Sequence, residues 1–248
     1  MTDAQTAQAV AADTVDVADG VDVADVAETA DEKGAAEAPQ PQPQTPRHGA
    51  AGAVLAIISG PSGVGKDTII EALRARQGDA NYHYVVTCTT RAPRPGEVPG
   101  VSYQFVSEDE FLRLRSAGEL LEANEVHEHW YGTPRAQVAD ALEAGRDVIL
   151  KIDVQGAQVV KERVPDALLI FIVPPSMEAL FQRLRSRATE TAGELELRQR
   201  NAAIELARQG DYDRVVVNET GEVERTAAEI EAIIAQEKRR HPDRVVRL

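Results

Sequence analysis

The chain contains one cysteine, few aromatic residues and no long apolar run, and these shortages exclude several classes of protein. Among its 248 residues the lone cysteine, Cys88, cannot form an internal disulfide, which excludes a disulfide-stapled extracellular scaffold. No stretch approaches the ~18 consecutive apolar residues that a membrane-spanning helix requires. We therefore expect a protein of the reducing cytoplasm without a membrane partner.

The first 50 residues lack aromatic side chains altogether. They hold ten acidic residues against two basic ones, together with the run Ala-Pro-Gln-Pro-Gln-Pro-Gln at positions 38–44. A segment of this composition cannot bury enough apolar surface to fold. It also has neither the apolar block of a secretory signal nor the arginines of a mitochondrial one. We predict that residues 1–51 form a disordered acidic tail.

This leader carries more than half of the net charge of −14. The remainder of the chain then has an ordinary solubility charge, which gives no indication of a nucleic-acid partner. Its length suits one domain, predicted at residues 52–238, followed by a short C-terminal tail at 239–248.

Apolar strand-like runs alternate with helical patterns along this domain. Strands are predicted at residues 54–58, 83–87, 148–153, 168–173 and 214–217, and helices at 176–187, 194–208 and 222–237. Such alternation is typical of an α/β fold with a mostly parallel sheet and flanking helices.

A small lobe is predicted within residues 88–133. The stretch 91–100 contains three prolines and two glycines and must be a loop. Short strands are expected at 103–106, 120–126 and 128–131.

Two helix starts can be predicted in and beside this lobe. Ser107 and Glu110 have the spacing of a capping box, in which the serine hydroxyl caps the new helix. Thr133 is the expected N-cap of a second helix, which Pro134 opens and Gly145 ends.

A phosphate-binding loop follows the first strand. It consists of Gly60, Pro61, Ser62, Gly63, Val64, Gly65 and Lys66, in the spacing GxxxxGK. Small residues let backbone N–H groups converge on phosphate oxygens, the lysine reaches the outer phosphates, and a helix N-terminus points at the anion. The next residue is Asp67 instead of the usual Ser or Thr that binds Mg²⁺, and Thr68 comes one position later. The loop predicts a nucleotide-binding site with an altered metal region.

Four further motifs resemble those of the guanylate kinase family. They follow the loop in the family's order and spacing: Thr-Thr-Arg-Ala-Pro-Arg-Pro-Gly-Glu at 89–97, Tyr-Gln-Phe-Val-Ser at 103–107, Tyr-Gly-Thr at 131–133 and Ile-Asp-Val-Gln-Gly at 152–156. The resemblance covers about residues 52–238. It implies a P-loop NTPase-type parallel sheet with an inserted GMP-binding lobe at about 88–133 and a helical lid at about 183–200.

The implied reaction is transfer of the γ-phosphoryl group from ATP to GMP, or to dGMP, with Mg²⁺ accompanying ATP. The segment from Gly60 to Thr68 would bind ATP, and the resemblance adds Asn218 on the adenine side. ATP and GMP would be the only partners that the sequence indicates.

Phosphoryl transfer needs positive charge, because its transition state is mostly spread negative charge. The resemblance assigns this role to Lys66 and to three arginines of the lid, Arg183, Arg187 and Arg198. Arg183 and Arg187 stand four residues apart and therefore share a helix face.

The acceptor phosphate has its own candidate ligands. Arg91 and Arg94 lie three residues apart on a proline-stiffened loop and can grip phosphate oxygens in the bidentate manner that lysine lacks. The resemblance assigns both to the GMP phosphate, counts Arg91 among the catalytic residues and adds the hydroxyl of Tyr103. It also implies contacts from Tyr131 and Thr87.

Guanine recognition is expected at Glu122. The N1–H and N2–H₂ groups of guanine form a donor pair that adenine lacks, and a carboxylate can accept from both. The resemblance places Glu122 at this contact, with Thr133 beside it and Asp153 near guanine and the metal. Two alternatives stay open, since the Thr133 hydroxyl could be committed to its helix cap, and Asp153 could simply cap the following helix.

Two departures from the family pattern concern the metal region. Asp67 adds an anion where a hydroxyl is expected, and Lys151 adds a cation where the family usually has an acid. We predict that the two compensate each other, with Asp67 contacting Mg²⁺ directly or through water and pairing with Lys151.

Two other functions are compatible with the fold. A related fold phosphorylates a sugar phosphate, but a sugar has no guanine edge for Glu122 and Thr133 to read. Guanylate-kinase-like modules bind phosphopeptides without catalysis; the intact phosphate loop argues against this function, while Asp67 and Lys151 argue mildly for it.

Overall fold

A five-stranded parallel sheet forms the centre of the computed structural model, which describes residues 47–77, 82–126, 128–186 and 192–248. The strands run in the order β2-β7-β1-β8-β9, and every neighbouring pair is parallel. Their bounds are β1 Leu55–Ser59, β2 Tyr82–Tyr84, β7 Asp147–Lys151, β8 Leu168–Val173 and β9 Arg214–Val217. The predicted α/β fold with a parallel sheet is confirmed.

Helices cover both faces of this sheet, as a parallel sheet requires. Along β1, Leu55 and Ile57 belong to one apolar core, whereas Ala56 and Ile58 belong to the other, because successive side chains point to opposite faces. α3 (Arg135–Glu143) and α4 (Val154–Arg163) pack on the first face, and α1 (Lys66–Gln77) and α7 (Val223–Arg240) on the second.

A second, four-stranded sheet makes up the inserted lobe. Its order is β4-β3-β6-β5, with β3 Cys88–Thr89, β4 Gln104–Phe105, β5 Leu120–Val126 and β6 His129–Pro134. Helix α2 (Glu108–Ser116) buries Phe111 against Cys88 and Leu120. The predicted serine cap is present, since the Ser107 hydroxyl accepts a hydrogen bond of 3.2 Å from the backbone N–H of Glu110.

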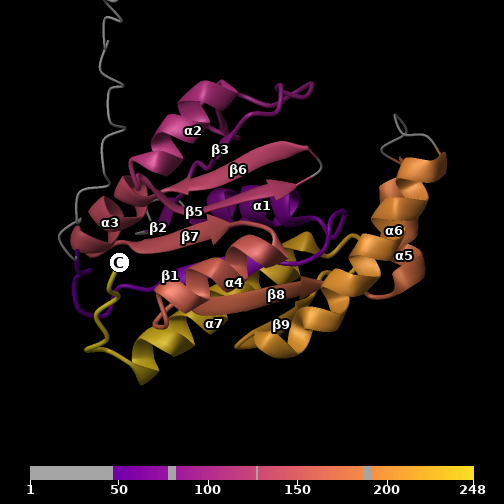
Figure 1. Ribbon diagram of the computed structural model, residues 1–248. Coiled ribbons are helices and arrows are strands. Elements are labelled where there is room, and N and C mark those ends of the chain that lie inside the picture. The colour runs from indigo at the N-terminus through magenta and orange to yellow at the C-terminus, as the bar shows by residue number, and fades with distance from the viewer. Residues whose placement is uncertain (1–46, 78–81, 127, 187–191) are drawn as a thin grey trace, which may run out of the picture. The chain divides into compact units, whose positions relative to one another are not determined.

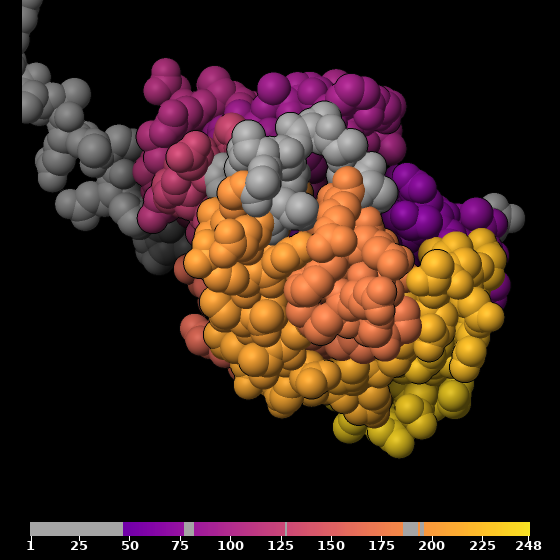
Figure 2. Space-filling model, turned by 90° about the vertical axis from the view of Figure 1, so that its right-hand side faces the viewer, coloured from indigo at the N-terminus to yellow at the C-terminus, as the bar shows by residue number. Residues whose placement is uncertain are grey.

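Helices α5 (Met177–Ser186) and α6 (Ala192–Leu206), with the short 3₁₀ helix η1 (Ala207–Asp211), connect β8 to β9. In Figure 1 they stand at the end of the sheet to which the carboxyl ends of the strands point. Viewed from that side, α5 and α6 lie in the middle of the face, with residues of the inserted lobe above them and α7 beside them (Figure 2). Arg187 lies outside the described residues.

The ends of the domain differ from the predicted boundaries. Residues 47–49, assigned above to the disordered tail, pair with the last residues: His48 bridges Arg247, and the Gly49 N–H donates to the Val246 carbonyl at 2.8 Å. Val246 is fully buried in the core beneath α3. The C-terminal segment is therefore part of the folded domain, and the leader up to residue 46 lies outside the described residues.

Other local predictions need correction as well. The strand predicted at 83–87 is β2, which ends at Tyr84, and the final helix continues to Arg240. In the described part of the chain, no helix combines the length and apolar character needed to cross a membrane.

Candidate active site

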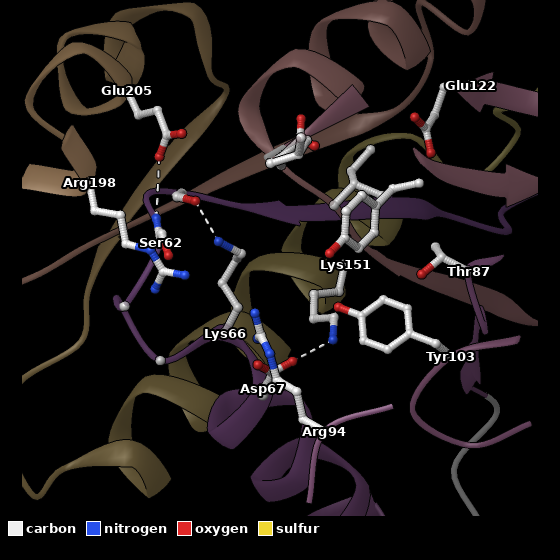
Figure 3. A pocket seen from close by; sticks show the side chains of 17 residues that line it. Ser62, Lys66, Asp67, Thr87, Arg94, Tyr103, Glu122, Lys151, Arg198 and Glu205 are labelled. Carbon is white, nitrogen blue, oxygen red and sulfur yellow. Dashed lines mark hydrogen bonds and ion pairs between the residues drawn. The ribbon is translucent and has the colours of Figure 1, made fainter. Parts of the chain in front are cut away.

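A pocket opens where the carboxyl ends of β1 and β7 face the inserted lobe (Figure 3). Ligands of open α/β sheets bind at this edge. The lining residues come from the phosphate loop, the inserted lobe, β7 and α6: Gly60, Ser62, Gly63, Gly65, Lys66, Asp67, Thr87, Arg94, Tyr103, Glu122, Val126, Tyr131, Lys151, Ile152, Asp153, Arg198 and Glu205. The pocket thus joins most of the predicted ATP-side and GMP-side residues.

The phosphate loop owes its shape to its glycines. Gly60 has φ 144° and Gly65 has φ 101°, conformations that side-chain-bearing residues rarely adopt. A Cβ at Gly60 would lie 2.4 Å from the carbonyl oxygen of Ile172, and one at Gly65 would lie 2.6 Å from Nδ2 of Asn218. The backbone can therefore wrap closely before α1 begins at Lys66, which leaves the N–H groups of the helix start facing the pocket.

Lys66 is folded back onto this loop. Its ammonium donates to the carbonyl oxygens of Gly60 at 2.5 Å and Pro61 at 3.1 Å. Burial lowers the pKa of Lys66, which the nearby carboxylates of Glu205, Asp67 and Asp153 partly offset. Its charge is thus held in the loop, where phosphate oxygens would compete with the two carbonyls.

Glu205 of α6 places a carboxylate at the mouth of the same loop. Its Oε2 accepts a hydrogen bond of 3.3 Å from the backbone N–H of Ser62 (Figure 3). Burial raises the pKa of Glu205, against the opposing effect of Lys66. A loop N–H that could bind phosphate is therefore occupied by an oxygen from the lid helix.

On the opposite side of the pocket, Glu122 is a buried carboxylate held by two donors. The Thr133 hydroxyl donates to Oε1 at 2.6 Å, and the Asn124 side-chain amide donates to Oε2 at 2.6 Å. Because a carboxylate has about four acceptor positions, each oxygen keeps capacity for a further donor. Burial raises the pKa of Glu122 to about 7, the Thr133 and Asn124 hydrogen bonds lower it, and the Asp153 charge raises it.

The prediction that Thr133 caps the next helix is wrong. Thr133 still belongs to β6 and pairs across the ladder with Glu122, which places both side chains on one face of the sheet. The N-cap position is Pro134, which makes no side-chain cap hydrogen bond, and α3 begins at Arg135. The threonine hydroxyl is therefore available to Glu122.

Glu97 accepts hydrogen bonds from both loop arginines, from the side chain of Arg91 and from the backbone of Arg94. Both Nη atoms of Arg91 contact the Glu97 carboxylate, at 2.8 and 3.0 Å, and its Nε donates to the Tyr131 hydroxyl at 3.2 Å. Glu97 also accepts from the backbone N–H of Arg94 at 2.7 Å. Arg94 lines the pocket and Arg91 does not, so the pair does not meet at one point in this conformation.

The aromatic side of the pocket is formed by Tyr103 and Tyr131. Their rings lie edge to face with centroids 6.0 Å apart. Thr87, which is 5 % exposed, lines the pocket beside Tyr103. All three predicted acceptor-side hydroxyls are thus gathered in the pocket.

The predicted pairing of Asp67 with Lys151 is confirmed, since the Lys151 ammonium forms an ion pair with the Asp67 carboxylate (Figure 3). Within the described ranges, no group of three or more His, Cys, Asp or Glu residues is arranged to hold a metal ion. Mg²⁺ at a nucleotide usually needs only one or two carboxylates besides phosphates and water, so Asp67 fits this role.

Asp153 caps the following helix and also lies in the pocket, while its predicted place near guanine and the metal stays a prediction. It lines the pocket, and its Oδ1 accepts from the backbone N–H of Gly156 at 2.8 Å as the N-cap of α4. The same carboxylate therefore begins a helix and adds negative charge near Glu122.

The lid arginines occupy different places. Arg198 of α6 lines the pocket. Arg183 of α5 instead binds the phosphate loop from behind, with hydrogen bonds to the Val64 carbonyl at 3.1 Å and the Asn218 carbonyl at 3.0 Å. Arg183 thus supports the loop, while Arg187 lies outside the described residues.

Asn218 and Thr68 are not among the residues that line the pocket. The Asn218 amide donates to the Val64 carbonyl at 2.8 Å, and its oxygen accepts from the Thr226 hydroxyl at 3.2 Å. Its side chain therefore stabilises the phosphate loop, and an adenine contact stays a prediction. Thr68 is exposed on the first turn of α1, next to Asp67, which takes the position facing Lys151.

Three polar residues that contact site residues had no role assigned from the sequence: Glu205, Asn124 and Glu97. Glu205 lies 143 positions from Ser62, the loop residue that it contacts, and no local sequence pattern predicts a contact over that separation. Asn124 could have been found from strand alternation, because positions 122 and 124 share one face of β5.

Known proteins resemble this chain over most of its described length. A family model described as guanylate kinase matches residues 53–237. The chain is 48% identical over 188 residues to the guanylate kinase of Symbiobacterium thermophilum, covering 75% of this chain and 87% of that protein. It is 46% identical over 185 residues to the guanylate kinase of Caldanaerobacter subterraneus subsp. tengcongensis, covering 75% and 88%.

Among solved structures, the crystal structure of guanylate kinase from Anaplasma phagocytophilum superposes with a TM-score of 0.62 at 36% identity, covering 76% of this chain and 88% of that one. The family match spans most of the described domain, and the relatives are matched over most of their length. The chain belongs to the guanylate kinase family.

Proposed function

We propose that this protein is a guanylate kinase that transfers the γ-phosphoryl group of ATP to GMP, giving ADP and GDP. The observation that carries the proposal is Glu122, a buried carboxylate with an acceptor position left on each oxygen, in the pocket that also contains the phosphate loop. Guanine offers two adjacent N–H donors to such a carboxylate, whereas adenine presents an acceptor at N1 and would leave it unpaired.

The pocket supplies alignment and positive charge for the transfer. Lys66 would contact the outer phosphates of ATP once they displace the loop carbonyls from its ammonium. Arg198 approaches from α6 and Arg94 from the inserted lobe, so cations lie on the donor and the acceptor side of the pocket. An oxygen of the GMP phosphate attacks the γ-phosphorus as the bond to the β–γ bridging oxygen breaks, and these cations neutralise the spread charge.

Mg²⁺ would enter with ATP, and Asp67 is the residue that would hold it. The ion would bring additional positive charge to the outer phosphates.

The acceptor phosphate would be gripped by Arg94 and the Tyr103 hydroxyl. Arg91 can join them only if its guanidinium leaves Glu97. In the conformation described, Arg91 orders the loop that carries Arg94, because Glu97 bridges the Arg91 side chain and the Arg94 backbone.

A coupled ADP-release assay with GMP, dGMP, AMP, CMP, UMP and a sugar phosphate as acceptors tests the proposed activity. Turnover confined to GMP, and weaker with dGMP, is expected. Binding of GMP without turnover would instead favour a phosphopeptide-binding module, and turnover of a sugar phosphate would favour the related kinase. We also propose a cytoplasmic location, supported by the single buried cysteine.

A further inference from the structure

Lys151 is the last residue of β7 and projects from the carboxyl edge of the sheet into the middle of the pocket. Figure 3 shows its side chain between the phosphate-loop residues Lys66 and Asp67 on one side and Tyr103 of the inserted lobe on the other. It is therefore placed between the donor and the acceptor halves of the site.

The surroundings of Lys151 keep its charge in this position. Its side chain is only 19% exposed, its ammonium pairs with Asp67, and Nζ lies 4.9 Å from the centroid of the Tyr103 ring. Burial lowers the pKa of Lys151, but Tyr103 and Asp67 outweigh that effect and raise it overall. The group is thus a fixed ammonium packed on the face of a tyrosine.

The two partners of the ion pair between Lys151 and Asp67 differ in their exposure to solvent. The Asp67 side chain is 63% exposed, and pairs that involve a well-solvated partner contribute little stability. An ammonium has three donors; one goes to Asp67 and a second interacts with the Tyr103 side chain, which leaves the third for a further acceptor. Lys151 can therefore serve a second anion without losing a strong interaction.

The second anion that we consider is the phosphate group of GMP, which needs more positive charge than one arginine supplies. A phosphate monoester carries about −1.5 to −2 at neutral pH. Of the two loop arginines, Arg94 lines the pocket, while Arg91 is engaged by Glu97 in a bidentate pair. Lys151 contacts Tyr103, the residue to which we assign the acceptor phosphate, and would therefore provide a second cation beside Arg94.

We propose that Lys151 binds the phosphate group of GMP, together with Arg94 and the Tyr103 hydroxyl. The inference rests on the proposed function, since it assumes that GMP is the acceptor. At this position the family usually has an acidic side chain, and Lys151 would instead supply a positively charged hydrogen-bond donor.

Binding measured by calorimetry, without ATP and in the presence of EDTA, tests this role apart from catalysis and metal. GMP and guanosine are titrated into the wild-type protein, Lys151→Met and Lys151→Arg. For Lys151→Met we expect a loss of at least about tenfold in GMP affinity and no more than about a twofold change for guanosine, because a charge-assisted hydrogen bond to the phosphate is removed. Lys151→Arg should keep most of the GMP affinity. Lys161→Met, which removes a lysine paired with Asp213 outside the pocket, is the matched control and should bind both ligands normally.

A double variant separates phosphate binding from mere neutralisation of Asp67. If Lys151 only neutralises that carboxylate, Asp67→Asn combined with Lys151→Met should restore GMP affinity to within about twofold of wild type. Such restoration overturns the inference, as does GMP affinity of Lys151→Met within twofold of wild type, or an equal loss for guanosine. Should Lys151→Met fail to fold, Lys151→Gln is measured under the same criteria. A wild-type protein that does not bind GMP would overturn the proposed function itself, which keeps the two failures apart.

Discussion

The ionisation of Glu122 should make guanine binding depend on pH in the neutral range. Burial raises the pKa of this carboxyl to about 7 in the unliganded protein. Guanine can be bound through both N–H groups only by the ionised form, because a protonated carboxyl turns one acceptor into a donor. If only that form binds, the Kd rises by about twofold at pH 7 and about elevenfold at pH 6 over its high-pH limit.

The assay is calorimetric titration of guanosine between pH 6 and 8. Guanosine is preferred to GMP because the phosphate of GMP titrates near pH 6 and would add a second dependence. Glu122→Gln is the control variant. Its free energy of guanosine binding at pH 8 should be less favourable than that of the wild type by about 1–3 kcal/mol, and its Kd should not change with pH. A wild-type Kd that stays constant from pH 8 to 6, or a variant that keeps the slope, refutes this reasoning.

The same carboxyl should weaken the unliganded fold at high pH. Its pKa rises from an ordinary 4.5 to about 7 on folding, so the folded state binds the proton more tightly. The stability contribution is complete below about pH 4.5 and is lost as the pH rises through 7, amounting to about 3 kcal/mol. Glu122→Gln should therefore raise the free energy of unfolding at pH 8. The gain is at most the about 3 kcal/mol given above, reduced by about 1 kcal/mol because the glutamine forms a weaker hydrogen bond. Urea unfolding at pH 5 and pH 8 measures the difference, and an equal effect at both pH values would contradict this assignment.

Four further outcomes are expected. Lys66→Ala should lower kcat at least about a hundredfold in the coupled assay while leaving the urea midpoint nearly unchanged, and near-normal turnover would contradict the role of its charge. Gly65→Ala should raise the KM for ATP and cost about 1–3 kcal/mol of stability, because a Cβ would lie 2.6 Å from a neighbouring amide at a φ of 101°. Asn124→Ala removes a hydrogen bond that lowers the pKa of Glu122, so the midpoint of guanosine binding should move to higher pH; a downward shift would be inconsistent with this contact. Deleting residues 1–46 should leave kcat and Tm within experimental error, and a lower Tm would show that the leader contributes to the fold.

The sequence was sufficient where short-range patterns determine structure. The phosphate loop could be predicted because its spacing, its glycines and the strand before it are contiguous, and the acidic and basic departures at 67 and 151 were recognisable as a compensating pair. The alternation of strands and helices likewise predicted the parallel sheet.

Prediction failed where two distant segments determine one side chain. Thr133 has the sequence appearance of a helix cap, but the register of β5 against β6 places it opposite Glu122 and redirects its hydroxyl. That Arg91 shares a phosphate with Arg94 stays a prediction; in this conformation Glu97 of the same loop holds the Arg91 guanidinium, a contact that the spacing of the two arginines did not indicate. Strand register and loop closure depend on tertiary packing, which local spacing does not encode.

The pairing of the two ends of the domain has a practical consequence for dissecting the protein. The matched family region stops at residue 237, yet Val246 fills the core and the Leu248 N–H donates to the Arg47 carbonyl at 3.0 Å. A fragment limited to residues 53–237 would lose the pairing of the two chain ends and leave a cavity in place of Val246. Loss of this buried side chain should lower the free energy of unfolding by about 1.5–3 kcal/mol. The unit that folds is therefore longer at both ends than the unit that comparison recognises.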